Sequence, residues 1–134
     1  MADKDSYWLV KLRNHLIEKD STLRHFKSQI EEHKDKLILI KFWASWCRPC
    51  LNDDEKLSIL KTKGEFDPFV IGVQNDKKPF PKTISYLNFL DSSRIITSYY
   101  NVGVFPTYIL LENGINVVRT TSLQELLDYY KLHK

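Results

Sequence analysis

Cysteine is scarce in this sequence, and its scarcity excludes whole classes of protein. The chain of 134 residues holds only two cysteines, Cys47 and Cys50, and both lie in one Cys-x-x-Cys run. A scaffold held together by several disulfides needs more cysteines, and a structural zinc site usually needs four ligands. No histidine has a spacing suited to completing a metal site, so we expect no metal and ordinary side chains at His15, His25, His33 and His133.

Long apolar runs and an excess of one charge are also missing. No stretch approaches the roughly 18 apolar residues of a membrane-spanning helix, and residues 1–6 lack the apolar core of a signal peptide. We therefore expect a soluble chain without a membrane span, and we leave its compartment open. The formal charge is only +3, with basic residues spread among nearly as many acids, so nucleic acid is not a favoured partner.

The sequence does contain enough material for one compact core. It is 43% hydrophobic and 13% aromatic, which excludes a disordered chain, and its length fits a single domain. Residues 7–19 place leucines at helical spacing without deciding between a docked helix and an extended arm. We therefore expect an N-terminal extension of uncertain structure over residues 1–21 and one domain over residues 22–134.

Hydrophobic periodicity and turn signals predict the elements of that domain. We expect helices at 22–33, 51–63, 92–100 and from 122 to about 131, and strands at 37–43, 69–73, 86–90, 108–111 and 115–118. Asp91 should cap the third of these helices, and Gly64 should end the second. Inward positions of the middle helices are Leu57, Leu60, Ile95, Ile96 and Tyr99. This order predicts an α/β sandwich with helices on both faces of a mixed sheet.

The two cysteines lie where a predicted strand passes into a predicted helix. Unpaired N–H groups and the positive end of the helix dipole converge at such a junction, so the pKa of Cys47 should fall at least a unit below that of a free thiol. Two intervening residues bring Cys50 within bonding reach of Cys47. Pro49 suits a first helical turn, where its missing N–H leaves no hydrogen bond unmade.

Two segments of the sequence carry a family resemblance. The run FWASWCRPC over residues 42–50 strongly resembles the active-site segment of thioredoxins, and GVFPT over residues 103–107 resembles their second signature, the cis-proline loop. The resemblance covers residues 22–134 and implies a thioredoxin fold with a mixed central sheet of four to five strands and helices on both faces. Extra residues between Val73 and Asp91 look more like the TlpA-like bacterial thiol-disulfide oxidoreductases, which favours the periplasm or cell envelope over the alternative, the cytoplasm.

The resemblance also implies roles for individual residues. Cys47 would be the nucleophile and Cys50 the resolving thiol. Trp46, Phe105 and Pro106 would shape a platform for an extended substrate segment, with Phe105–Pro106 as the cis peptide. No bound cofactor would be needed, because the disulfide itself carries the electrons.

The sequence departs from the family pattern at two positions that would tune the dithiol. Lys41 stands where thioredoxins carry a buried acid, and Arg48 stands where TlpA-like relatives often carry a glutamate. Cations near the dithiol favour the thiolate and would make the protein more oxidising, whereas Asp53 and Asp54 would oppose that shift. Two further residues belong to this tuning set: Pro49, and Trp43 as a wall against water.

The resulting functional hypothesis is dithiol–disulfide exchange with protein substrates by a monomer, reset by an upstream redox partner protein. The reductase direction is the first choice by resemblance, with disulfide oxidase or isomerase as the alternative. An alternative from another class is a redox-inert thioredoxin-fold binding module. We expect a solvated face and infer no partner for three loop lysines, Lys77, Lys78 and Lys82.

Overall fold

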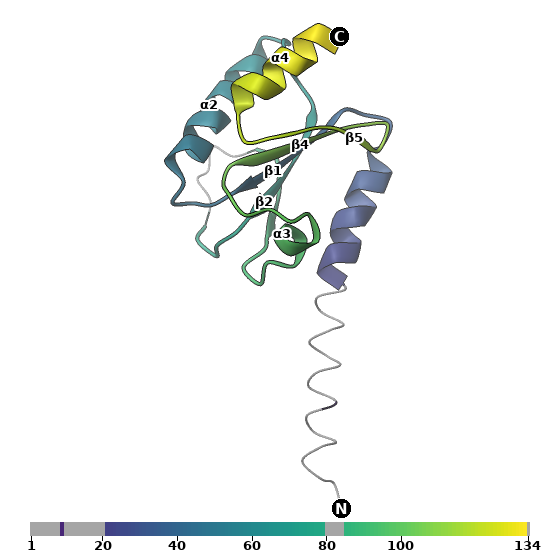
Figure 1. Cartoon of the computed structure of the whole chain (residues 1–134), viewed down its shortest axis with the longest axis vertical. Coiled ribbons are helices and arrows are strands. Elements are labelled where there is room, and N and C mark those ends of the chain that lie inside the picture. Colours follow the sequence, from purple (N-terminus) through teal and green to yellow (C-terminus); the bar gives the residue numbers. More distant parts are fainter. Residues whose placement is uncertain (1–8, 10–20, 80–84, 134) are drawn as a thin grey trace, which may run out of the picture.

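The computed structural model of the chain describes residue 9 and residues 21–79 and 85–133. Most of the extension predicted over residues 1–21 lies outside the described residues, as does part of the loop predicted over residues 75–82. In the described part the chain forms one mixed sheet with helices on both faces (Figure 1). The predicted fold class is confirmed.

Five strands form the sheet in the order β3-β2-β1-β4-β5. Their bounds are β1 (Ile38–Trp43), β2 (Phe69–Gln74), β3 (Leu87–Leu90), β4 (Thr107–Glu112) and β5 (Ile115–Thr120). The central strand β1 pairs in parallel with β2, which pairs in parallel with β3, and β4 runs antiparallel to both β1 and β5. Because β1, β2 and β3 are parallel, the segments that follow them all leave at one edge of the sheet.

The predicted hairpin of β4 and β5 is confirmed, and its turn has the backbone that its residues favour. Asn113 and Gly114 connect the strands with φ values of 53 and 78 degrees. A two-residue hairpin turn of this kind needs positive φ at both positions, which asparagine and glycine adopt at low cost.

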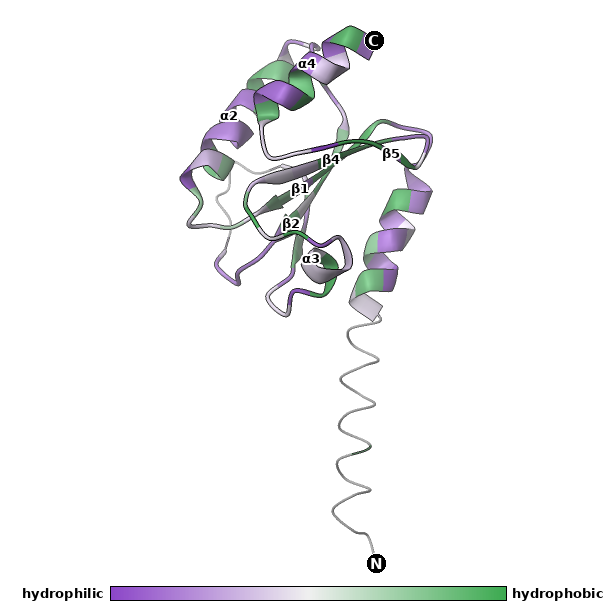
Figure 2. Cartoon of the chain, in the orientation of Figure 1, coloured by the Kyte–Doolittle hydropathy of each residue, from purple (hydrophilic) through white to green (hydrophobic). Residues whose placement is uncertain are grey.

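The helices span residues 21–32, α2 (Arg48–Thr62), α3 (Ile95–Tyr99) and α4 (Leu123–His133). They carry mixed hydrophobic and hydrophilic bands along their length (Figure 2), as expected for helices that bury one side. Helix α2 begins at Arg48, ahead of the predicted residue 51, and Gly64 follows its end with φ 70 degrees. The predicted cap at Gly64 is therefore confirmed.

Strand β1 is buried on both faces, so it separates two apolar cores. On one face alternate side chains of β1 pack with Phe26 of the helix over residues 21–32 and with Ile96 of α3. On the other face Leu39 packs with Leu57 of α2 and Leu126 of α4. This explains the nearly continuous hydrophobicity of the strand in the sequence.

The prediction for the third helix was wrong at its start and at Tyr99. Both carboxylate oxygens of Asp91 accept hydrogen bonds from backbone N–H groups, of Ile96 at 3.1 Å and Thr97 at 2.8 Å, so Asp91 caps the helix as predicted. The chain turns through Arg94, which has φ 60 degrees, and the helix starts only at Ile95. In this register Ile96 faces the core, and Tyr99 points outward with 51% of its surface exposed.

Candidate active site

The two cysteines form a disulfide at the start of α2. Cys47 has extended backbone and occupies the position that caps the helix, after a turn in which its N–H donates to the carbonyl of Ala44 at 3.1 Å. The Cα atoms of Cys47 and Cys50 lie 5.3 Å apart, and the Cys50 N–H donates to the Cys47 sulfur at 3.3 Å. A helix N-terminus therefore points a backbone donor at the first sulfur, an arrangement that stabilises negative charge there.

The disulfide is almost completely covered by apolar side chains. Cys50 is fully buried and Cys47 is 3% exposed, in a cluster with Trp43 and Ala44 against which Phe105 packs. Trp43 is itself fully buried and packs in the same cluster as the two cysteines. Cys47 therefore keeps a small exposed surface, whereas Cys50 has none.

The loop predicted to face the dithiol does lie beside it. The peptide bond between Phe105 and Pro106 is cis, and the Phe105 ring meets the Trp46 ring edge-on with centroids 6.2 Å apart. Trp46 is 69% exposed, and Val104 also presents its side chain to solvent. Trp46 and Val104 thus form an exposed apolar rim on either side of Phe105.

Arg48 and Pro49 lie in the first turn of α2, and the structure places both side chains in solvent. Proline is accommodated there because the first N–H groups of a helix have no partner within the helix. Of the two cations considered for tuning, Arg48 therefore lies on the outside of the dithiol, whereas Lys41 lies beneath it.

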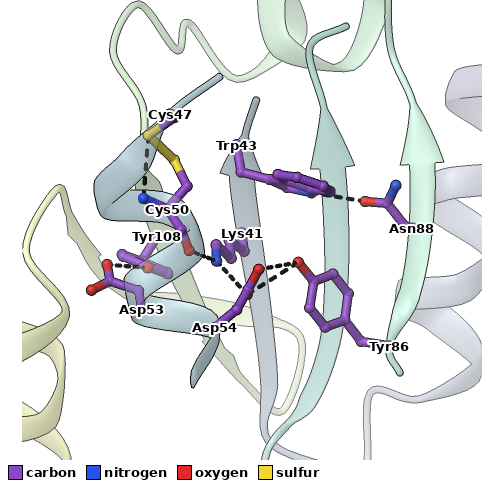
Figure 3. Close-up of polar contacts among 9 residues, drawn as sticks. All are labelled: Lys41, Trp43, Cys47, Cys50, Asp53, Asp54, Tyr86, Asn88 and Tyr108. Atoms are coloured by element: carbon purple, nitrogen blue, oxygen red, sulfur yellow. Dashed lines mark hydrogen bonds and ion pairs between the residues drawn. A yellow bond between two sulfur atoms is a disulfide. The ribbon is translucent and has the colours of Figure 1, made fainter. Parts of the chain in front are cut away.

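Lys41 is fully buried in the middle of β1, and its ammonium is satisfied by two groups from α2. It donates to the carbonyl oxygen of Cys50 at 2.6 Å and forms an ion pair with Asp54. The Tyr86 hydroxyl donates to both oxygens of Asp54, at 3.2 and 3.3 Å. Figure 3 shows the ammonium between the Cys50 carbonyl and the Asp54 carboxylate, so the cation lies closer to the dithiol than the anion does.

Burial shifts the pKa values of this cluster in the direction that favours the neutral form of each group. It lowers the pKa of the Lys41 ammonium, and the Asp54 charge offsets this only in part. Burial also raises the pKa of the Asp54 carboxyl against the opposing effect of Lys41. The pKa of Tyr86 is raised by burial and by the Asp54 charge, so its hydroxyl stays protonated as a donor.

Gly72 of β2 makes room for this cluster. It lies next to Lys41 in the sheet on one side and next to Asn88 on the other. A Cβ atom at position 72 would lie 2.5 Å from a ring carbon of Tyr86 and 2.5 Å from the side-chain oxygen of Asn88. Only glycine therefore lets Tyr86 cross the strand to reach Asp54.

A second polar network holds the turn that precedes Cys47. The Trp43 ring N–H donates to Asn88 at 2.8 Å, Asn88 donates to Gln74 at 3.0 Å, and Gln74 donates to Asp76 at 2.9 Å. Asp76 then accepts hydrogen bonds from the backbone N–H, at 3.1 Å, and the hydroxyl of Ser45. Partial burial alone would raise the pKa of Asp76, but the hydrogen bonds from Ser45 and Gln74 outweigh it and lower that pKa.

The sequence placed Asp53 and Asp54 only as charges in the first turns of α2. The structure ties both to the sheet instead: Asp53 accepts a hydrogen bond from the Tyr108 hydroxyl at 2.6 Å, and Asp54 pairs with Lys41. The sequence showed that Lys41 replaces the buried acid of thioredoxins, and it did not show that Asp54 pairs with this lysine. Helical spacing could have shown this, because Asp54 follows Cys50 by one turn and so shares its sheet-facing side. Three partners that only the fold brings together also escaped sequence reasoning: Asn88, Gln74 and Tyr86.

Among residues 21–79 and 85–133, no three acidic, cysteine or histidine side chains gather closely enough to hold a metal ion. No helix in the described part of the chain has the length and apolar character needed to cross a membrane.

Comparison with known proteins gives consistent matches. The family model described as Thioredoxin matches residues 18–130. The thioredoxin-like protein YneN of Bacillus subtilis is 31% identical over 105 residues, which cover 70% of this chain and 61% of that protein. The thiol-disulfide oxidoreductase ResA of Bacillus cereus is 27% identical over 127 residues, or 87% of this chain and 71% of that protein. The crystal structure of reduced Schistosoma mansoni thioredoxin is 27% identical, with a TM-score of 0.58 over 81% of this chain and 89% of that one.

Proposed function

The chain belongs to the thioredoxin family, and from that premise we propose that it is a thiol-disulfide oxidoreductase acting on protein substrates. The observation that carries this proposal is the Cys47–Cys50 disulfide at the N-terminus of α2, beside the Phe105–Pro106 loop. The proposed catalytic domain covers residues 22–134, acts as a monomer and needs no cofactor besides the cysteine pair.

In the reducing direction, the exchange proceeds through a mixed disulfide. The Cys47 thiolate attacks one sulfur of the substrate disulfide, and the other substrate sulfur leaves as a thiolate that takes up a proton. Cys50 then loses its proton and attacks the Cys47 sulfur, which releases the second substrate thiol. Two electrons have passed to the substrate, and a dithiol of an upstream redox partner must restore the Cys47–Cys50 pair to its reduced form.

The burial of the two cysteines supports this division of roles. Cys47 alone retains exposure, and it receives the N–H of Cys50, so it is suited to attack an external disulfide. Cys50 is fully buried and can reach only the sulfur of Cys47. The exposed Trp46 ring and the Phe105–Pro106 loop are suited to hold an extended substrate segment next to Cys47.

A second candidate function, disulfide oxidase or isomerase, is favoured by Lys41. Its buried ammonium lies against the Cys50 peptide with Asp54 on its far side (Figure 3), and a nearby cation stabilises a thiolate. Stabilising the reduced form makes a dithiol pair more oxidising. The reduction potential separates the candidates: a value near about −270 mV indicates a thioredoxin-like reductant, and one near about −120 mV an oxidant. Replacing Lys41 by methionine should lower the potential in either case.

We also propose that the chain is closer to TlpA-like oxidoreductases than to minimal thioredoxins. The segment between Val73 and Asp91 contributes an additional parallel edge strand, β3. From that segment, Asn88 reaches Trp43 and Tyr86 reaches Asp54. The similarity to ResA over 87% of the chain is in keeping with this placement.

Insulin reduction by dithiothreitol tests the proposed function. The wild-type protein should accelerate precipitation of the insulin B chain, whereas Cys47→Ser should not, because the proposed attacking thiol is gone. A wild type no faster than Cys47→Ser would instead support a redox-inert binding module.

A further inference from the structure

We propose that this site selects protein disulfides flanked by acidic side chains, because its dithiol lies within a rim of exposed cations. This inference rests on the proposed function and names its substrate class. The basic rim consists of four exposed residues from three different segments of the chain: Arg48, Lys77, Lys78 and Arg94. The sequence alone predicts only a solvated face for the two lysines, since nothing in it places them near Cys47.

Hydrogen bonds join the three segments into one continuous edge around the dithiol. Asp76 contacts Ser45, which brings the loop after β2 against the turn that carries Cys47. Arg94 donates to the side chain of Asn75 at 3.4 Å, and to the carbonyl of Val102, next to the cis-proline loop, at 3.3 Å. These contacts place the loop after β2 and the start of α3 beside one another and beside the turn that carries Cys47.

The loop that presents the two lysines is held in place by side-chain hydrogen bonds. Gln74 donates to the carbonyl oxygen of Lys78 at 2.7 Å and to Asp76 at 2.9 Å. Both ends of this short stretch are thus fixed to β2 and, through Asp76, to Ser45. The two lysines therefore extend from a loop that contacts the turn carrying Cys47, where their charges can act on an approaching substrate.

The described segments around the dithiol carry more cations than acids. Residues 44–50, 75–79 and 91–106 contain two acids, Asp76 and Asp91. Asp76 is bound to Ser45 and Gln74, and Asp91 is buried against the start of α3. These segments therefore carry four cations against two carboxylates, a formal excess of two positive charges, in a chain whose formal charge is +3.

This arrangement fits an extended acidic segment around a cystine. Trp46 and Val104 offer exposed apolar contacts near the disulfide. The cations of the basic rim would attract acidic residues that flank the cystine. Exposed charges of this kind change association rates more than they change bound-state affinity, and their effect falls as salt is added.

The test compares three peptides with the same cystine core, flanked by glutamate, glutamine or lysine, as disulfide substrates of the full chain. At low ionic strength we expect the glutamate peptide to be reduced about tenfold faster than the lysine peptide, with the glutamine peptide between them. The preference should shrink at high salt. The double variant Lys77→Glu/Lys78→Glu should abolish or invert it, since both exposed side chains change from cation to anion.

A matched control variant is Lys63→Glu/Lys131→Glu, which makes the same change in net charge. Lys63 follows the far end of α2, about 22 Å from the dithiol by helix rise, and Lys131 lies in α4. Retention of the glutamate preference in this control supports the basic rim. Equal rates for the three peptides at low salt, or an equal loss of preference in both double variants, would overturn the inference while leaving the exchange activity in place. Failure of every peptide, with wild type equal to Cys47→Ser, would overturn the proposed function itself.

Discussion

Lys41 can remain charged in the core only because Asp54 and the Cys50 carbonyl accept its hydrogen bonds. Taking one member out of a buried ion pair leaves the other charge without compensation, which costs more than the pair itself contributes. The same lysine fixes the first turn of α2 to β1. One residue thus connects the stability of the domain with the electrostatics of the dithiol.

The first residue-scale prediction concerns Lys41→Met, which keeps the apolar stem and removes the ammonium. We expect the free energy of unfolding to fall by about 3 kcal/mol, because the Asp54 carboxylate loses its partner. Denaturant unfolding of the oxidised protein measures this loss. Adding Asp54→Asn to the variant should restore part of it, and a loss under about 1 kcal/mol for Lys41→Met would contradict the importance of the pair.

The second residue-scale prediction concerns pH and Asp76. Its pKa in the folded protein lies below the ordinary value of 3.8, so in acid the unfolded chain binds the proton more readily than the folded one. The contribution of this carboxylate is therefore complete above pH 3.8 and is lost as the pH falls through the lower, folded pKa. Unfolding measured from about pH 2 to 6 should show wild type losing its advantage over Asp76→Asn on acidification. A difference that grows in acid would be inconsistent with this sign.

Among the elements, β2 is the strand whose composition most directly controls the site. It has no side chain at Gly72. There Tyr86, just before β3, reaches over it toward α2, and Asn88 of β3 reaches toward β1. Gln74, two positions on, links the same strand to the loop carrying Asp76. A shift of β3 relative to β2 would therefore disturb both hydrogen-bond networks near the dithiol, the one that contains Asp54 and the one that contains Asp76.

The element-scale prediction is that Gly72→Ala destabilises the protein by about 1–3 kcal/mol, since two side chains must move to admit one methyl group. The displaced Tyr86 should also change the reduction potential by weakening the Asp54 cluster. Gly103→Ala serves as the control, because a Cβ there meets no atom within 4 Å. Equal stability of the two variants in denaturant titrations would refute the proposed crowding at position 72.

For the molecule as a whole, local signals were enough to predict the layers of the fold. Periodicity placed the strands and helices, and the Asn113-Gly114 turn placed the hairpin, because each depends on neighbours in sequence. The Lys41–Asp54–Tyr86 cluster was not predicted, because it depends on which strands are adjacent and on the absence of a side chain at Gly72. Tyr99 was misplaced because the chain turns through Arg94, with φ 60 degrees, before the helix starts at Ile95.

The position of the charged loop was likewise outside the reach of sequence reasoning. Lys77 and Lys78 lie near the dithiol only because β2 runs parallel to β1 and Asp76 binds Ser45. The same pairing brings the carboxyl ends of the two strands to one edge, where the cysteines and the basic rim meet. The cysteine motif alone therefore could not show which charged residues lie near the dithiol. That requires the order of the strands in the sheet.

The measurement that most directly tests the account is the rate of alkylation of the reduced protein as a function of pH, with Cys50→Ser used to isolate the thiol at position 47. The start of α2 should hold the Cys47 thiolate stable, so the reaction midpoint should lie at least one pH unit below the value of about 8.5 for a free thiol. A midpoint near about 8.5 would contradict the claim that this junction of strand and helix activates Cys47.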